Sequence, residues 1–247
     1  MTPETKACVV LVVGSAPDVV RCRFWPRSTF SEIVAINNAW RIRDDWDYLI
    51  APDDFPRERI PHILRPGQSL VGSAEYVPAN NRFGGVFYAG GTMAFTAGYW
   101  ALHALRPSIL TFVGCDMVYA ASGKTHFYGS GDADPLRDDL SLRSLEAKSA
   151  RLLLHAAELE CACVRLSSGE SRLVFPSMDH EDLGRAAASR ISITPGPLFD
   201  MAKDVEERLG YRCESGRYWE IAEEFSIERV DELDSLWLRA AQAAMVA

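Results

Sequence analysis

The chain has 247 residues, of which 48% are hydrophobic and 24% are charged, and its net charge is −8. This composition is ordinary for a folded protein rather than a disordered one, and it suits one large domain, alone or with a small appendage. Proteins that grip DNA or RNA need a basic surface, and no run of lysine and arginine supplies one here. We therefore expect no nucleic-acid partner, although backbone N–H groups can bind a small anion even in an acidic protein.

The first apolar run, residues 7–13, is too short for a secretory signal or a membrane span, and a Gly-Ser-Ala-Pro turn ends it. We expect it to be the first buried strand of a cytoplasmic protein that is not transmembrane. The six cysteines lack the paired C-x-x-C spacing of a zinc site, so we expect reduced, structural thiols.

Predicted strands and helices alternate along most of the chain. Continuous apolar runs predict strands at 7–13, 32–37, 47–51, 108–113 and 161–166, with shorter extended stretches at 69–72 and 86–88. Long helices are predicted at 93–105 and 139–158, and a polar loop at 117–138. This order indicates an α/β fold with a Rossmann-like, mostly parallel sheet and helices on both faces.

The composition changes near residue 178, where apolar strands give way to acidic helical segments. These segments are 180–190, 197–209, 216–224 and 231–245. We therefore predict a Rossmann-like nucleotide-binding domain at 1–177 and a helical C-terminal appendage at 178–247. The appendage could cover the site, mediate dimerisation or pack on the sheet, and the sequence does not decide the oligomeric state.

Ligands of open α/β sheets bind beyond the carboxyl ends of the strands. The nucleotide-binding candidates there are Gly14, Ser15, Ala16, Pro17, Asn37, Asn38, Asp53, Gly90, Gly91, Thr92, Tyr119 and Lys124. A Gly-Gly pair permits close backbone approach, and the helix start that follows it favours a phosphate. Neither a Gly-x-Gly-x-x-Gly fingerprint nor a Walker A loop is present, so a plain turn without ligand stays open for residues 14–17.

The catalytic candidates are Asp116, His126 and Tyr128, which follow the strand predicted at 108–113. His126 is the one histidine in a polar loop just past a strand end, beside Lys124 and Thr125. Histidine is the side chain best suited to general base catalysis near neutral pH. The alternatives are a surface histidine without a role and an Asp116 that only forms a turn.

Several of these segments resemble the donor-binding motifs of sialyltransferases. Residues 8–15 with Ile36-Asn37-Asn38 resemble the first motif, and Gly90-Gly91-Thr92 with residues 110–114 resembles the second. Thr125-His126-Phe127-Tyr128 resembles the short His-Tyr-Tyr motif, and Gly114-Cys115-Asp116 resembles a strand–Gly–x–Asp arrangement of the bacterial members. The resemblance covers roughly residues 7–176.

This resemblance implies a glycosyltransferase that moves a sialic-acid-like sugar from a CMP-activated donor to a glycan or lipid-linked acceptor, with inversion and without a metal. The N–H groups of residues 14–16 and 91–92 would hold the phosphate, and Asn37, Asn38 and Asp53 would bind ribose and base. Lys124, Tyr119 or Tyr128 would stabilise the leaving charge. His126 would remove the proton of the acceptor hydroxyl.

The chain departs from that family at two points. Ser15 stands where the first motif usually has Asn, and residues 135–146 lack the histidine that is the family's usual base. Either His126, Asp138 or Asp139 takes that role, or the activity differs.

The chain is also similar to the archaeal 6-hydroxymethylpterin pyrophosphokinases and the related motility accessory proteins. The similarity rests on the Gly-x-x-Pro loop at 14–17, on Gly114-x-Asp116 and on residues 123–126. It implies pyrophosphoryl transfer from ATP, with Mg²⁺ bound by Asp116, Asp53 or Asp54. A nucleotide-binding module without activity is the third hypothesis.

Overall fold

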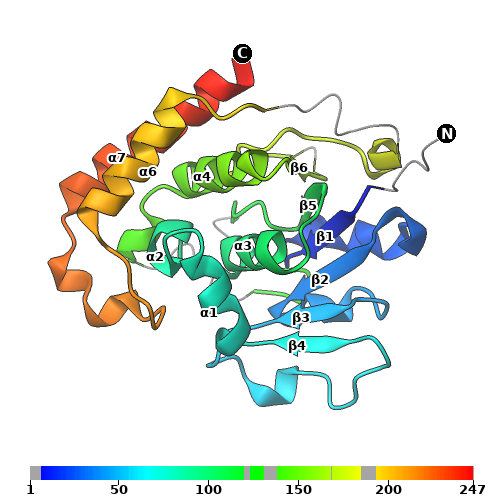
Figure 1. Ribbon diagram of the computed structural model, residues 1–247. Helices are drawn as coiled ribbons and strands as arrows, with labels where there is room; N and C mark the ends of the chain where they lie inside the picture. Colours follow the sequence, from blue (N-terminus) through cyan, green and yellow to red (C-terminus); the bar gives the residue numbers. More distant parts are fainter. Residues whose placement is uncertain (1–6, 120–122, 131–137, 168, 185–192, 247) are drawn as a thin grey trace.

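A six-stranded, entirely parallel sheet lies at the centre of the computed structural model, which describes residues 7–119, 123–130, 138–167, 169–184 and 193–246 (Figure 1). The strands are β1 (Val9–Val13), β2 (Glu32–Ile36), β3 (Tyr48–Ile50), β4 (Ser69–Val71), β5 (Ile109–Val113) and β6 (Ala162–Arg165). Their spatial order is β4-β3-β2-β1-β5-β6. The predicted Rossmann-like α/β fold is confirmed.

The strand order creates a switch point beside β1. The chain moves outward from β1 through β2 and β3 to β4, and then returns to the other side of β1 to form β5 and β6. Val12 accordingly pairs with Val34 on one side and with Phe112 on the other. Connections leave β1 and β5 in opposite directions, so a crevice forms beyond their carboxyl ends, which is where such sheets bind ligands.

Both faces of the sheet are covered, which explains the continuous apolar strands. All five residues of β1 are buried. Val10 and Val12 pack toward α1 (Ser73–Asn81), α3 (Met93–Ala104) and α4 (Leu145–Glu158). Leu11 and Val13 pack on the other face, which is covered by the 3₁₀ helices η1 (Pro17–Phe24), η2 (Arg27–Thr29), η3 (Asn37–Arg41) and η7 (His180–Gly184). The predicted helices on both faces are confirmed, but one face carries 3₁₀ rather than α helices.

Some predicted elements differ in the structure. The stretch 86–88, predicted to be extended, forms the short helix α2 (Val86–Ala89). Gly84 and Gly85 precede it with φ of 88° and 102°, so the chain turns back sharply, and Phe87 is buried beneath the appendage. Helix α1 was not predicted, and Pro78, a residue type that usually interrupts helices, lies within it.

The shorter elements also differ from their predictions. The segment 216–224 forms two 3₁₀ turns, η8 (Tyr218–Glu220) and η9 (Ala222–Glu224), instead of one helix. Further 3₁₀ turns are η4 (Arg57–Arg59) and η6 (Leu140–Leu142). Of the helix predicted at 180–190, η7 is described, and residues 185–190 lie outside the described residues.

The two long helices of the appendage pack on the helical layer, whereas η7, near its start, covers the opposite face of the sheet. Figure 1 shows α6 (Pro197–Leu209) and α7 (Ile227–Val246) on the outer side of α4. Their apolar faces bury Phe199 and Trp237 against α4 and α2. Within the described part of the chain, no helix combines the length and the apolar character that crossing a membrane requires.

Two buried ion pairs join α4 to the appendage. The Arg151 guanidinium donates to both carboxylate oxygens of Glu206, at 2.6 and 2.8 Å, and Lys148 Nζ lies 2.8 Å from Asp234 Oδ1. Each of these four side chains is less than 9% exposed. Because removing one partner of a buried pair leaves the other charge uncompensated, these contacts tie the appendage firmly to the core.

Candidate functional site

The carboxyl ends of β1 and β5 touch at two glycines. The N–H groups of Gly14 and Ala16 donate to the carbonyl oxygens of Val113 (2.8 Å) and Gly114 (3.0 Å). A Cβ on Gly14 would lie 2.2 Å from Gly114 O, and Gly114 has a φ of 68°. The glycine requirement is therefore structural. The prediction that the Gly14 and Ala16 N–H groups hold a phosphate is wrong, because both already have acceptors.

We expect Gly14→Ala to destabilise the fold and to distort the crevice. The added methyl group meets backbone atoms, which cannot rotate away, so a cost of about 1–3 kcal/mol or more is expected. Chemical unfolding of both proteins measures it. Gly196→Ala is the control, because no atom lies within 4 Å of a Cβ at Gly196. Equal stability of the two variants would contradict the tight contact between β1 and β5.

A small pocket of about 140 Å³ lies above these strand ends. The ends of β1, β2 and β5, the start of α3 and the segments around residues 117–119 and 126–128 form its walls. Eight predicted site residues line it: Gly14, Ser15, Ala16, Asn37, Thr92, Tyr119, His126 and Tyr128. The structure thus brings together residues that are up to 114 positions apart, from Gly14 to Tyr128.

Asn37 turns the chain sharply at the carboxyl end of β2. Its φ is 51°, in the left-handed region that Asn tolerates better than most residues. The side-chain oxygens of Asn37 and Asn38 are both buried without a hydrogen-bond partner. An unsatisfied buried acceptor costs about 1–3 kcal/mol, and an N–H group of a ligand would remove that cost at Asn37, which lines the pocket.

The start of α3 faces the pocket. Thr92 caps this 12-residue helix by accepting a hydrogen bond from the N–H of Phe95, at 3.3 Å. Met93 and Ala94 line the pocket, and the N–H groups of a first turn have no acceptor within the helix. Such a helix start favours an anionic group.

The N–H groups predicted to hold the phosphate before α3 already have acceptors within the protein. The N–H of Gly91 already donates to Ser141 Oγ (3.0 Å), and that of Thr92 donates to Gly90 O (2.7 Å). Gly90 and Gly91 do not line the pocket. The prediction for the Gly91 and Thr92 N–H groups is therefore wrong, whereas Met93 and Ala94, in the first turn of α3, do line the pocket.

His126 is held in the pocket by a tight turn. Its N–H donates to Gly129 O (2.9 Å), and the N–H of Phe127 donates to Ser15 O (2.9 Å), which pins the turn to the end of β1. Its ring is 7% exposed and stacks on Tyr128 at a centroid distance of 4.9 Å. The structure therefore places His126 inside the crevice, unlike a histidine on an open loop.

Thr125 contacts the ring of His126. Its hydroxyl lies 2.9 Å from His126 Nδ1. When Nδ1 carries the proton and donates to this hydroxyl, Nε2 keeps its lone pair, which is the form that a general base needs. Sequence reasoning missed this contact. The available signal was a hydroxyl residue directly before the candidate base.

Several predicted residues lie outside the pocket. Asp116 accepts a hydrogen bond from Ser167 Oγ (2.6 Å), and Asp53 accepts one from Ser73 Oγ (2.7 Å). Pro17 and Lys124 are exposed and do not line the pocket, and neither does the buried Asn38. The geometry therefore does not support the predicted catalytic role of Asp116 or the predicted donor contacts of the other four residues.

The predicted magnesium ligands do not meet. Asp53 follows β3 and Asp116 follows β5, which are three strand positions apart, or roughly 14 Å at the usual strand spacing. Asp116 does lie near Asp18, whose pKa is raised by burial and then by repulsion from Asp116. Among the described residues, no three His, Cys, Asp or Glu side chains gather in a group that could hold a metal ion.

The alternative bases predicted at 138–139 are also outside the pocket. Asp138 is exposed. Asp139 accepts hydrogen bonds from Ser141 Oγ (2.6 Å) and from the hydroxyl of Tyr218 (2.7 Å). It therefore joins η6 to the appendage, and His126 is left as the base candidate that the pocket contains.

Cys115 lines the pocket but is not an activated nucleophile. It is 6% exposed, and burial, with a further contribution from Asp116, raises its pKa well above its ordinary value. The thiol is therefore protonated near neutral pH, and a thiol is a poor nucleophile. All six cysteines are free thiols.

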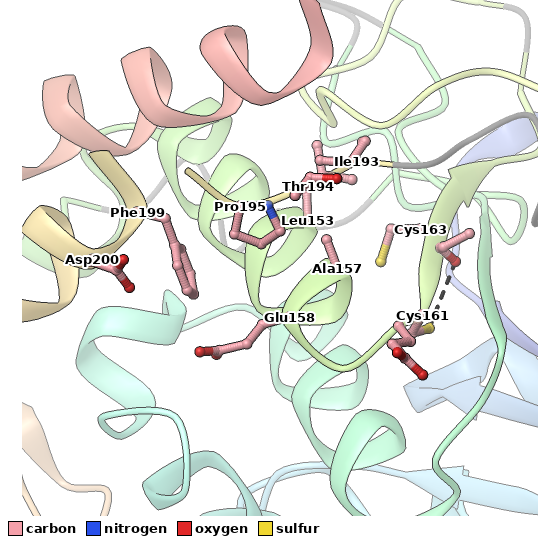
Figure 2. Close-up of a pocket in the computed structure, with 12 residues that line it drawn as sticks. Leu153, Ala157, Glu158, Cys161, Cys163, Ile193, Thr194, Pro195, Phe199 and Asp200 are labelled. Carbon is pink, nitrogen blue, oxygen red and sulfur yellow. Dashed lines mark hydrogen bonds between the residues drawn. The ribbon is translucent and has the colours of Figure 1, made fainter. Parts of the chain in front are cut away.

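A larger hollow of about 660 Å³ lies between α4, β6 and the segment 193–200 (Figure 2). Glu158, Glu160 and Asp200 line it, and the described residues supply no lysine or arginine to its wall. Burial raises the pKa of Cys161 there to about 12. This acidic hollow contains none of the predicted site residues and would repel a nucleotide phosphate.

Comparison with known proteins does not assign the chain to a family. No family model, no curated protein and no solved structure matches it.

Proposed function

We propose that this protein is a glycosyltransferase that moves a sialic-acid-like sugar from a CMP-activated donor to a hydroxyl group of a glycan or lipid-linked acceptor. The observation that carries the proposal is the buried His126, 2.9 Å from the Thr125 hydroxyl, in the crevice at the switch point of the sheet. The same crevice contains the start of α3 and the unpaired oxygen of Asn37. Such a transfer needs a general base, a site that binds the donor phosphate and a polar group that recognises the nucleotide base.

The donor phosphate would bind at the start of α3. The N–H groups of Met93 and Ala94 and the backbone of Ser15 surround the space, so that the donor's negative charge meets a helix start. Asn37 Oδ1 would accept from the exocyclic amine of cytosine. At about 140 Å³ the pocket is smaller than the roughly 300–1,000 Å³ of most ligand sites. It would therefore hold only the phosphate and the adjoining groups of the donor. The rest of the donor would extend over Tyr119 and Tyr128.

The reaction would be a single inverting displacement. The acceptor oxygen forms a bond to the anomeric carbon while the bond from that carbon to the phosphate oxygen breaks. The hydroxyl proton passes to His126 Nε2, and CMP leaves with the bonding electrons. Hydroxyl groups of Tyr119 and Tyr128, which line the pocket, would stabilise the departing phosphate.

The competing hypothesis is pyrophosphoryl transfer from Mg²⁺-bound ATP. The observation that favours it is that two carboxylates, Asp18 and Asp116, interact: burial, and then repulsion from Asp116, raise the pKa of Asp18. Asp116 does not line the pocket, however, and its carboxylate is already hydrogen-bonded to Ser167. We therefore rank it second.

A thermal-shift series with CMP, CDP, CTP, UDP, GDP, AMP and ATP, each with and without Mg²⁺, separates these functions. A ligand at 100 times its Kd stabilises the folded state by about 2.7 kcal/mol. We expect a metal-independent shift with CMP that Asn37→Gly abolishes, because glycine keeps the left-handed turn and removes the amide. A Mg²⁺-dependent shift that only ATP among these nucleotides produces would favour the pyrophosphokinase. No shift with any nucleotide would overturn both.

A further inference from the structure

A second polar pocket, of about 490 Å³, lies near the amino ends of β3 and β4. Residues 40–46 and 61–68 supply most of its wall, and these segments lead directly into the amino ends of β3 and β4. The candidate glycosyltransferase pocket lies beyond the carboxyl ends of β1, β2 and β5. The two pockets are therefore separate sites, and none of the sequence-predicted residues lines this second one.

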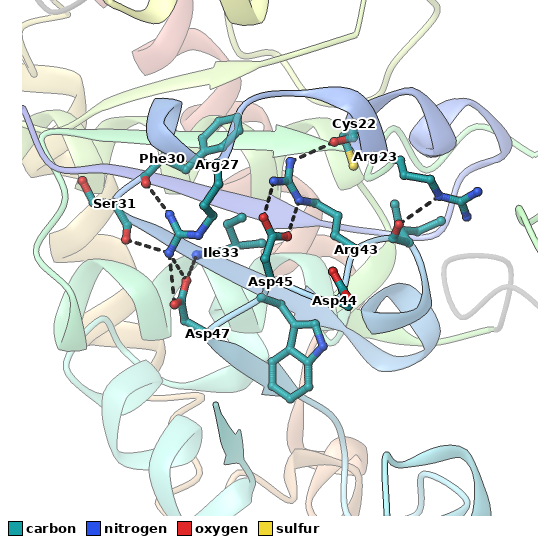
Figure 3. A network of polar contacts seen from close by, with 12 residues as sticks. Cys22, Arg23, Arg27, Phe30, Ser31, Ile33, Arg43, Asp44, Asp45 and Asp47 are labelled. Atoms are coloured by element: carbon teal, nitrogen blue, oxygen red, sulfur yellow. Dashed lines mark hydrogen bonds and ion pairs between the residues drawn. The ribbon is translucent and has the colours of Figure 1, made fainter. Parts of the chain in front are cut away.

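The wall of this pocket has more positive than negative side chains. Four arginines and two aspartates line it, although the whole chain carries a net charge of −8. Figure 3 shows Arg43 donating to both oxygens of Asp45, at 2.8 and 2.7 Å, and to Cys22 O. Arg65 pairs with Asp44 at 2.8 Å. Both carboxylates are thus neutralised within the pocket.

The other two arginines, Arg23 and Arg41, have no carboxylate partner among the described residues. Arg23 donates through Nε to Ile42 O at 3.1 Å, and Figure 3 shows its guanidinium directed away from the Arg43–Asp45 pair. The Arg41 guanidinium lies over the ring of Trp40, 5.4 Å from its centroid. Two guanidinium groups with unused donors therefore line one pocket.

We propose that this pocket binds the phosphate group of a phosphate monoester that carries an apolar part. A phosphate monoester has a charge of about −1.5 to −2 at pH 7, which matches the two unpaired arginines. Its three free oxygens can accept hydrogen bonds from two planar guanidinium groups, whereas the two oxygens of a carboxylate pair with a single guanidinium. Ile63 lines the pocket and Phe24 follows Arg23 in the chain, and both are 84% exposed, which offers an apolar surface to the rest of the ligand.

This chemistry is shared by a soluble phosphate ester and by a lipid headgroup, so the test uses a matched pair. Hexyl phosphate, a soluble monoester with a short apolar chain, is the soluble probe, and its binding is measured by calorimetry. Vesicles of phosphatidylcholine with or without phosphatidic acid, which carries the same phosphate on a diacylglycerol, are the lipid probe in a sedimentation assay. Binding of the soluble probe without vesicle binding assigns the free ester, and selective sedimentation with phosphatidic acid assigns the headgroup.

The decisive variant is Arg23→Gln/Arg41→Gln, which should weaken binding of either probe at least ~10-fold. Arg57→Gln/Arg208→Gln is the control, because it removes the same charge from two exposed arginines that do not line the pocket. Both variants should keep the melting temperature and the CMP response of the unchanged protein. Absence of binding to both probes, or equal binding by both variants, would overturn the proposal without affecting the proposed glycosyltransferase.

Discussion

Replacement of His126 by Ala is expected to lower the turnover number for sugar transfer by ~10²–10⁴-fold, the usual contribution of a general base. The ring is buried beside Tyr128, and the Thr125 hydroxyl lies 2.9 Å from Nδ1, which fixes the ring inside the pocket where the acceptor hydroxyl would bind. Initial rates with CMP-sialic acid and a range of glycan acceptors measure the effect. CMP should still raise the melting temperature of the variant, because the proposed phosphate contacts come from Ser15 and the start of α3.

A matched control separates the loss of the base from the loss of a histidine. His103→Ala changes an exposed histidine near the other end of α3, and we expect its turnover to be unchanged. Unchanged turnover of His126→Ala would show that His126 is not the general base. The loss of both turnover and CMP binding would assign His126 to ligand binding instead.

Replacement of Arg151 by Met is expected to destabilise the protein by about 3–5 kcal/mol, because it leaves the buried Glu206 carboxylate without its counter-charge. Arg151 also donates to the hydroxyl of Tyr99 (2.7 Å) and to the carbonyl oxygen of Phe83. Trp237 Nε1 donates to the same carboxylate of Glu206, so the pair connects α3, α4, α6 and α7. Urea unfolding of both proteins measures the change.

The control for this prediction is an exposed ion pair on the same two helices. Lys203 lies 2.7 Å from Glu158, and both side chains are more than a third exposed. Lys203→Met should therefore cost only about 0–1 kcal/mol. If Arg151→Met does not fold, Glu206→Gln keeps the shape of the side chain and should show a smaller loss. Equal stabilities of the buried and exposed variants would contradict the role of the buried pair.

The sequence by itself determined the fold class and the place of the candidate base. A strand buried on both faces must be apolar at every position, so the run of valines and leucine at 9–13 predicted both a strand and a covered sheet. His126 could be predicted as a site residue because its loop follows the strand that ends at Val113. These inferences depend on short segments, where local pattern and structure agree.

Only the tertiary structure decided which predicted residues meet. Asp53 and Asp116 both follow strands, but the order of the sheet places β3 and β5 three positions apart. The stretch 86–89 is helical because residues distant in the chain bury it, and Arg151 has a partner because α6 packs on α4. Strand order, helix docking and the burial of an ionised side chain depend on contacts between distant segments. A local periodicity carries no information about such contacts.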